Sequence, residues 1–175
     1  MPIPATRENL TEALARADDS SRADRVDRIE WLAQHYFHPG AVMGDLTILQ
    51  MLEEARLCFV SGHFVGALLL ATSFVEHTLS EELESLAPAQ ERHTFELMIK
   101  AGRQHLSLPN DLFDRTDRLR QLRNPFTHRK AANHPDAFGT RFLAKKVHPA
   151  TILESDAKLA MEVMYEWFRR PLRSA

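Results

Sequence analysis

Residues 64–86 read FVGALLLATSFVEHTLSEELESL, and this stretch decides the fold. Its apolar residues recur at intervals of three and four, the spacing that places side chains on one face of an α-helix. The apolar stripe comprises Phe64, Ala67, Leu68, Ala71, Phe74, Val75, Thr78 and Leu79, and acidic residues crowd the later half. One broad apolar face beside a charged face is typical of a core helix in a bundle. The sequence therefore predicts an all-α fold.

The segments on either side repeat this helical spacing. Asp45 is a suitable N-cap for the helix before this one, and Gly62 offers the left-handed conformation at which helices often end. Ser155 is expected to cap the last helix, and Pro171 to stop it. Further helices are predicted over residues 23–37, 46–61, 94–105, 111–122 and 156–170. We find no run of alternating strand pattern and no internal repeat.

Two segments lack this pattern. Residues 1–22 are expected to form a loosely held leader, and residues 131–153, which contain two prolines and a glycine, a long loop. The sequence thus predicts an up-and-down bundle of four to six helices with an extra N-terminal helix. We assign residues 1–44 to a leader and accessory helix, and residues 45–171 to the bundle.

Composition fits one globular domain. The chain has 175 residues, of which 44% are apolar and 26% charged. Its single cysteine, Cys58, lies in an apolar run and is interpreted as a small buried hydrophobe. The start of the chain lacks a signal-peptide pattern, and its longest apolar stretch, residues 64–75, is too short to cross a bilayer. We therefore expect a cytoplasmic protein with no membrane partner.

Positive charge gathers between residues 115 and 130. This segment holds six cations and one anion, although the whole chain has a net charge of −2. A local basic patch on an acidic body suits a site that meets phosphate at one place. The alternative interpretation is a solvated helix face. The candidate contacts to RNA or phosphate are Arg118, Arg120, Arg129 and Lys130.

The best-marked functional feature is the stretch LRNPFTHR at residues 122–129. Asn124 followed by Pro125 is a helix-start signal, because asparagine caps well and proline suits the first helical position. We therefore expect a kink there, with His128 in the first turn of a short new helix. The kink would let Arg123 and His128 converge in a solvated cleft. An arginine fork, an imidazole and free amides at a helix start would together form a phosphate site.

Spacing alone does not single out this pair. Arg129 and His134 repeat the interval without the Asn-Pro break, and we treat them as a decoy. The alternative for the first pair is a surface arginine with an incidental histidine. The remaining histidines show no spacing typical of a metal site, and no glycine-rich phosphate loop is present. The sequence therefore predicts neither a metal nor a cofactor.

The stretch LRQLRNPFTH, residues 119–128, resembles the signature of HEPN domains, a superfamily of helical-bundle ribonucleases and their inactive relatives. That signature is an arginine, often followed by a polar residue, with a histidine a few positions later. The family also has an earlier helical hairpin with a small-residue-rich second helix, which residues 46–80 resemble. An acid often sits on that helix, and Glu76 occupies a comparable place. The resemblance covers residues 45–171.

This resemblance implies metal-independent cleavage of single-stranded RNA at the interface of a homodimer. The ribose hydroxyl would attack the adjacent phosphate, which leaves a cyclic phosphate and a free hydroxyl. His128 is then the candidate acid and base, because imidazoles titrate near neutrality. Arg123 would hold the phosphate, Asn124 would orient the pair, and Glu76 would position Arg123 or His128. For Glu76 the alternative is an ordinary exposed acid.

Two functional hypotheses therefore stand. The first is an endoribonuclease acting as a toxin or a phage-defence effector, with an antitoxin or regulatory protein as partner. The second is a non-catalytic module that dimerises or binds a nucleotide or a protein. A purely structural bundle would leave the motif unexplained.

Overall fold

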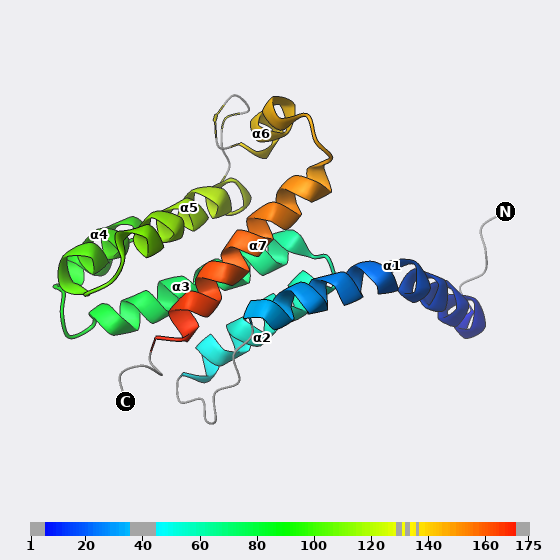
Figure 1. Cartoon of the computed structure of the whole chain (residues 1–175), viewed down its shortest axis with the longest axis horizontal. Coiled ribbons are helices and arrows are strands. Elements are labelled where there is room, and N and C mark those ends of the chain that lie inside the picture. Colours follow the sequence, from blue (N-terminus) through cyan, green and yellow to red (C-terminus); the bar gives the residue numbers. More distant parts are fainter. Residues whose placement is uncertain (1–5, 36–44, 129–130, 132–133, 136, 171–175) are drawn as a thin grey trace. The chain divides into compact units, whose positions relative to one another are not determined.

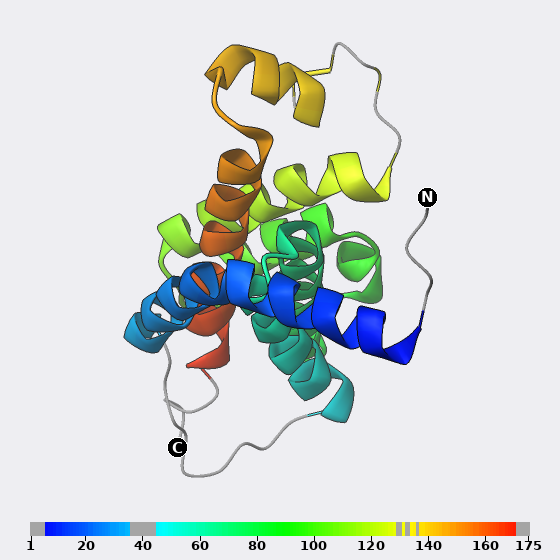
Figure 2. The same cartoon turned by 90° about the vertical axis from the view of Figure 1, so that its right-hand side faces the viewer.

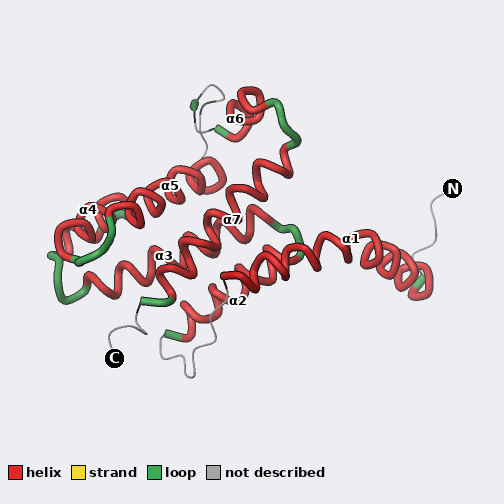
Figure 3. Tube along the Cα trace, in the orientation of Figure 1, coloured by secondary structure: helices red, strands yellow, loops and turns green. Residues whose placement is uncertain are grey.

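The computed structural model describes residues 6–35, 45–128, 131, 134–135 and 137–170. All regular elements within these ranges are helices (Figure 3), which confirms the all-α class. The elements are α1 (Arg7–His35), α2 (Leu46–Val60), α3 (Phe64–Leu83), the 3-10 helix η1 (Ala89–Arg92), α4 (Phe95–His105), α5 (Asn110–Thr127), α6 (Phe138–Lys145) and α7 (Pro149–Phe168). None of the described helices is both long and apolar enough to cross a membrane.

The chain divides into two units, residues 1–36 and 37–175. The first contains α1, a single helix of 29 residues. The expected leader over residues 1–22 was therefore wrong from Arg7 onward. The first turn is held by the Thr6 hydroxyl, and ion pairs between neighbouring turns, such as Arg16–Glu12 at 2.8 Å, support the helix without apolar spacing.

The hairpin predicted from residues 46–80 is present as α2 and α3. The Asp45 carboxylate accepts a hydrogen bond of 2.6 Å from the backbone N–H of Thr47, so Asp45 is the expected N-cap. Gly62 lies between the helices with a φ of 78°, which favours glycine. The rings of Phe59 and Phe64 pack across the turn, with centroids 6.1 Å apart.

The core is built around α3, which packs against α2, α4, α5 and α7 (Figures 1 and 2). Its apolar stripe is buried as predicted, and α7, whose Trp167 is fully buried near the end of the helix, packs against it. The indole N–H of Trp167 donates to the Thr116 hydroxyl of α5 at 3.0 Å. At Gly102 of α4 the helices approach so closely that an added Cβ would lie 2.6 Å from the Phe113 ring.

The last helix begins earlier than expected. Pro149 occupies its first turn, and the Nδ1 atom of His148 accepts a hydrogen bond of 3.2 Å from the N–H of Ala150. Ser155, predicted to be the cap, instead lies inside the helix. Proline is well suited to the first turn of a helix, because the N–H that it lacks would have no helical partner there.

The loop predicted over residues 131–153 was also wrong, because it contains α6. A fork of two hydrogen bonds, 2.6 and 2.7 Å long, joins the guanidinium of Arg141 in α6 to the Asp156 carboxylate in α7. Both side chains are almost fully buried. Figures 1 and 2 show α6 at the ends of α5 and α7. The ion pair thus secures a short helix that lacks a long apolar stripe.

The new helix start predicted at Pro125 is absent, because α5 continues through that residue to Thr127. The proline removes one backbone hydrogen bond, but it lies in the last turn, where this loss has the least effect. Packing offsets it: Leu122 is buried, and the ring of Phe126 lies 6.0 Å from that of Phe138 in α6. Tertiary contacts therefore override the local helix-start signal.

Candidate functional site

The structure brings Arg123 and Glu76 together. Arg123 lies on α5 and Glu76 on α3, 47 positions earlier in the chain. The guanidinium Nη1 donates to the Glu76 carboxylate at 2.5 Å, and the two side chains are 17% and 27% exposed. Glu76 is therefore a half-buried ion-pair partner of the motif arginine.

The guanidinium of Arg123 is held on a second side. Its Cζ atom lies 5.6 Å above the ring of Phe95, at the start of α4, in a cation–π arrangement. The buried Nε has no hydrogen-bond partner among the described residues. Three helices thus fix this arginine, and the expectation of a solvated cleft around it was wrong.

His128 takes a different position. It is the C-cap of α5, with φ −134° and ψ 131°, and its backbone N–H donates to the Asn124 carbonyl at 2.9 Å. Its side chain is exposed, and no hydrogen bond or ion pair joins it to a described residue. His128 therefore does not lie in the first turn of a new helix, where it was expected.

The helix end at His128 also has the opposite polarity from the one expected. A helix start would present free N–H groups to a phosphate, whereas a helix end presents carbonyl oxygens and a partial negative charge. Asn124 lies inside α5 and caps no second helix. Any phosphate contact here must therefore come from side chains.

The basic segment is not an open cationic face in the part of the chain that the structure describes. Arg115 contacts Glu166 of α7 at 2.5 Å, and Arg120 contacts Asp117 at 2.7 Å. Arg118 is exposed and donates to Gln121 at 3.2 Å. Arg129 and Lys130 lie outside the described residues.

The described residues contain no group of three or more His, Cys, Asp and Glu side chains that could hold a metal ion. Cys58 is partly buried, and burial together with the nearby Glu54 carboxylate raises the pKa of its thiol. A raised pKa keeps the thiol protonated at neutral pH, which makes it a poor nucleophile.

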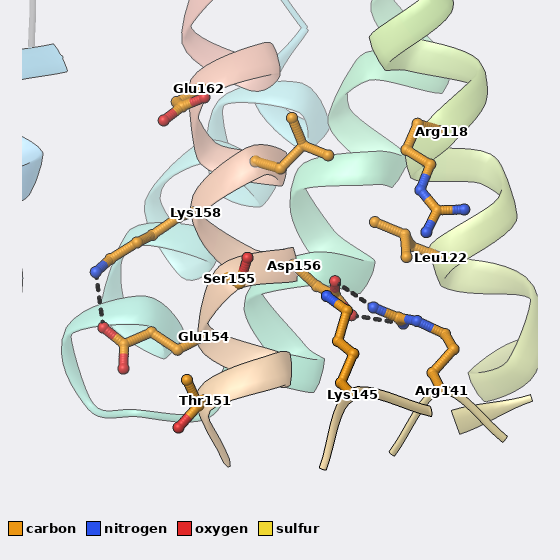
Figure 4. Close-up of a pocket in the computed structure, with 11 residues that line it drawn as sticks. Arg118, Leu122, Arg141, Lys145, Thr151, Glu154, Ser155, Asp156, Lys158 and Glu162 are labelled. Atoms are coloured by element: carbon orange, nitrogen blue, oxygen red, sulfur yellow. Dashed lines mark hydrogen bonds and ion pairs between the residues drawn. The ribbon is translucent and has the colours of Figure 1, made fainter. Parts of the chain in front are cut away.

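A second feature was missed by the sequence analysis. A groove of about 680 Å³ lies between α5, α6 and α7, and it is lined by charged and hydroxyl side chains (Figure 4). Its walls include Arg118, Arg141 and Lys145. These residues come from two helices, one of which was expected to be loop. The spacing of these residues in the sequence therefore could not predict the groove.

No protein-family model, no curated protein and no solved structure matches this chain.

Proposed function

We propose that this chain is a metal-independent endoribonuclease of the HEPN type, active as a homodimer. The observation that carries the proposal is the ion pair between Glu76 and Arg123. It joins the acid on the small-residue-rich helix to the motif arginine, as the resemblance to HEPN domains implies. The exposed His128 five residues later supplies an imidazole that substrate can reach.

In the proposed reaction, the 2′-hydroxyl of a ribose attacks the adjacent phosphorus. One imidazole removes the hydroxyl proton, and a protonated imidazole gives a proton to the departing 5′-oxygen. The products are a 2′,3′-cyclic phosphate and a 5′-hydroxyl end. Two copies of His128, one from each protomer, would provide these two functions. Arg123, kept in place by Glu76, would offset the charge that develops on the phosphate oxygens.

The deciding variant is His128→Ala. Because His128 is exposed at a helix end, its loss should leave the melting temperature nearly unchanged. We expect it to abolish cleavage of a mixed single-stranded RNA between pH 6 and 8. Wild-type cleavage should persist in EDTA and leave cyclic phosphate ends.

The matched control is His134→Ala, which removes the histidine of the decoy pair and should retain most activity. Arg123→Ala should also abolish cleavage, and the double variant should be little worse if the two residues act as a unit. If His128→Ala cleaved RNA as fast as wild type, His128 would not be the catalytic histidine of the motif. Loss of cleavage in EDTA with recovery on adding manganese would refute the metal-independent mechanism.

One observation favours a second candidate, a non-catalytic module that binds RNA, a nucleotide or a protein. Arg123 is only 17% exposed, and its charge is already offset by Glu76. Such an arginine can have a structural role, in which its ion pair with Glu76 joins α5 to α3. Wild-type protein that binds RNA yet cuts nothing would establish this candidate. A role as a toxin or phage-defence effector belongs to the nuclease candidate, and it would require an antitoxin or regulatory partner.

A further inference from the structure

The groove between α5, α6 and α7 has the dimensions of a small-molecule site. Its volume of about 680 Å³ falls within the range of roughly 300–1,000 Å³ that such sites occupy. All three walls belong to residues 37–175. The proposed catalytic residues Arg123 and His128 do not line the groove, although Arg118, a candidate RNA contact, does.

One wall of the groove contains a buried ion pair that joins α6 to α7. The fork between Arg141 and Asp156 holds α6 against α7, with the two side chains 9% and 6% exposed. Figure 4 shows this pair beside Lys145, and Arg118 approaching from α5. A buried ion pair contributes little net stability, because desolvation offsets much of the attraction. The pair also holds the backbone of α6, the helix that carries Lys145, against α7.

The charge balance of the groove favours an anion. Four cations and three carboxylates line it. Asp156 is engaged by Arg141, and Glu154 by Lys158 at 2.9 Å. Lys145 makes no ion pair with a described residue, although it is part of this charged lining. An ammonium group in this position suits a phosphate as a point charge.

The other lining residues suit a ligand that carries hydroxyl groups. Thr151 and Ser155 of α7 present hydroxyl groups, and Glu162 presents a carboxylate that can accept hydrogen bonds from ligand hydroxyls. Leu122 and Leu159 provide an apolar surface between them. A sugar ring combines hydroxyl edges with C–H faces, so its chemistry matches this mixture.

We infer that the groove binds a small phosphorylated polyol of the sugar-phosphate class, with the phosphate at Lys145 and Arg118. This inference stands apart from the nuclease proposal, since it uses neither Arg123 nor His128. The apolar surface of Leu122 and Leu159 accounts for a preference over inorganic phosphate.

The test is titration calorimetry on the full chain with four probes: ribose 5-phosphate, glycerol 3-phosphate, inorganic phosphate and ribose. We expect ribose 5-phosphate to bind most tightly and to raise the melting temperature. Lys145→Ala should weaken it about tenfold or more, as the loss of a charge-assisted hydrogen bond implies. Ser155→Phe, which fills the groove from an exposed position, should abolish binding.

Lys100→Ala is the matched control, because Lys100 pairs with Glu96 on α4, outside the groove. It should bind ribose 5-phosphate as wild type does, and so should His128→Ala. The inference is overturned if inorganic phosphate binds as tightly as ribose 5-phosphate, or if folded Lys145→Ala binds normally. It is also overturned if none of the probes binds, or if only a single-stranded RNA occupies the groove.

Discussion

At the scale of single residues, the guanidinium of Arg123 is constrained on two sides. A carboxylate and an aromatic ring hold its guanidinium, and 17% of the side chain remains exposed. Removing either partner of such a pair leaves the other charge half-buried without compensation. Structural and catalytic roles of Arg123 therefore have to be separated by measurement.

A double-mutant cycle on Arg123 and Glu76 provides that separation. Arg123→Gln and Glu76→Gln should each destabilise the protein, and the coupling free energy from urea unfolding should be about 1–2 kcal/mol. Glu12→Gln with Arg16→Gln is the control, because that pair is exposed on α1 and should couple by under about 0.5 kcal/mol. A coupling near zero for the first pair would contradict the contact seen in the structure.

Gly102 is constrained for a different reason, the close packing of α4 on its neighbours. An added Cβ would lie 2.6 Å from the Phe113 ring and 3.2 Å from Leu79. Gly102→Ala should therefore lower the free energy of unfolding by about 1–3 kcal/mol.

The matched control for this substitution is Gly139→Ala, which also changes a helical glycine. No atom lies within 4 Å of the added methyl group there. Because Gly139 lies in the first turn of α6, Gly139→Ala should stabilise the protein only slightly, by under about 0.5 kcal/mol. Urea unfolding measures both variants. If Gly139→Ala destabilised the protein as much as Gly102→Ala does, the destabilisation at Gly102 could not be attributed to crowding by Phe113.

At the scale of helices, apolar spacing and the N-cap of α2 were predictable from the sequence, whereas the cap of α7 and the long-range anchors were not. Asp45 accepts a hydrogen bond from Thr47 two residues later, and Gly62 takes a left-handed conformation in the turn itself, so the local sequence locates both. The helix α6 depends on Asp156, which lies 15 positions after its partner Arg141. The continuation of α5 through Pro125 depends on packing against α6 in the same way.

The cap at Asp45 also makes the stability of α2 depend on pH. Hydrogen bonds from Thr47 hold the pKa of the Asp45 carboxyl below its ordinary value of 3.8. A lowered pKa in the folded state means that the ionised cap stabilises the fold above about pH 3.8. That contribution is lost as pH falls through the lower, folded-state pKa.

Asp45→Ala should therefore lower the melting temperature at pH 7, and the difference from wild type should narrow below pH 3.8. Asp45→Asn keeps an oxygen acceptor without a titrating charge, so the stabilisation that the asparagine cap provides should not change as the pH falls. Melts between pH 3 and 7 compare the three proteins. If the difference in melting temperature between Asp45→Ala and wild type increased as the pH fell, Asp45 would not be a stabilising ionised cap.

At the scale of the whole molecule, the sequence predicted the all-α class because apolar spacing is strong in α3 and α7. It did not predict the groove, since that site requires α5, α6 and α7 to be placed in space. The polar half of α1 was missed for another reason. Helices supported by charged pairs between turns have no apolar period to detect.

The proposed homodimer is the prediction that belongs to this scale. Two copies of His128 are needed for the proposed acid and base, so activity should require association. Light scattering at tens of micromolar should give twice the mass of the 175-residue chain. Mixing His128→Ala with wild type should lower activity beyond simple dilution, because mixed dimers lack one imidazole. A monomer that cleaves RNA at full rate would contradict the dimeric site.

The packing of α3 against α7 has a consequence for the order of events during synthesis. The apolar stripe of α3 leaves the ribosome long before α7, whose first residue is Pro149, has been made. Until then, the buried face of α3 has no partner on the side that α7 covers. The growing chain must therefore keep this surface shielded by α2, α4 and α5 alone. Synthesis of α7 closes this side of the core, so a chain that lacks α7 would be a substrate for chaperones and proteases.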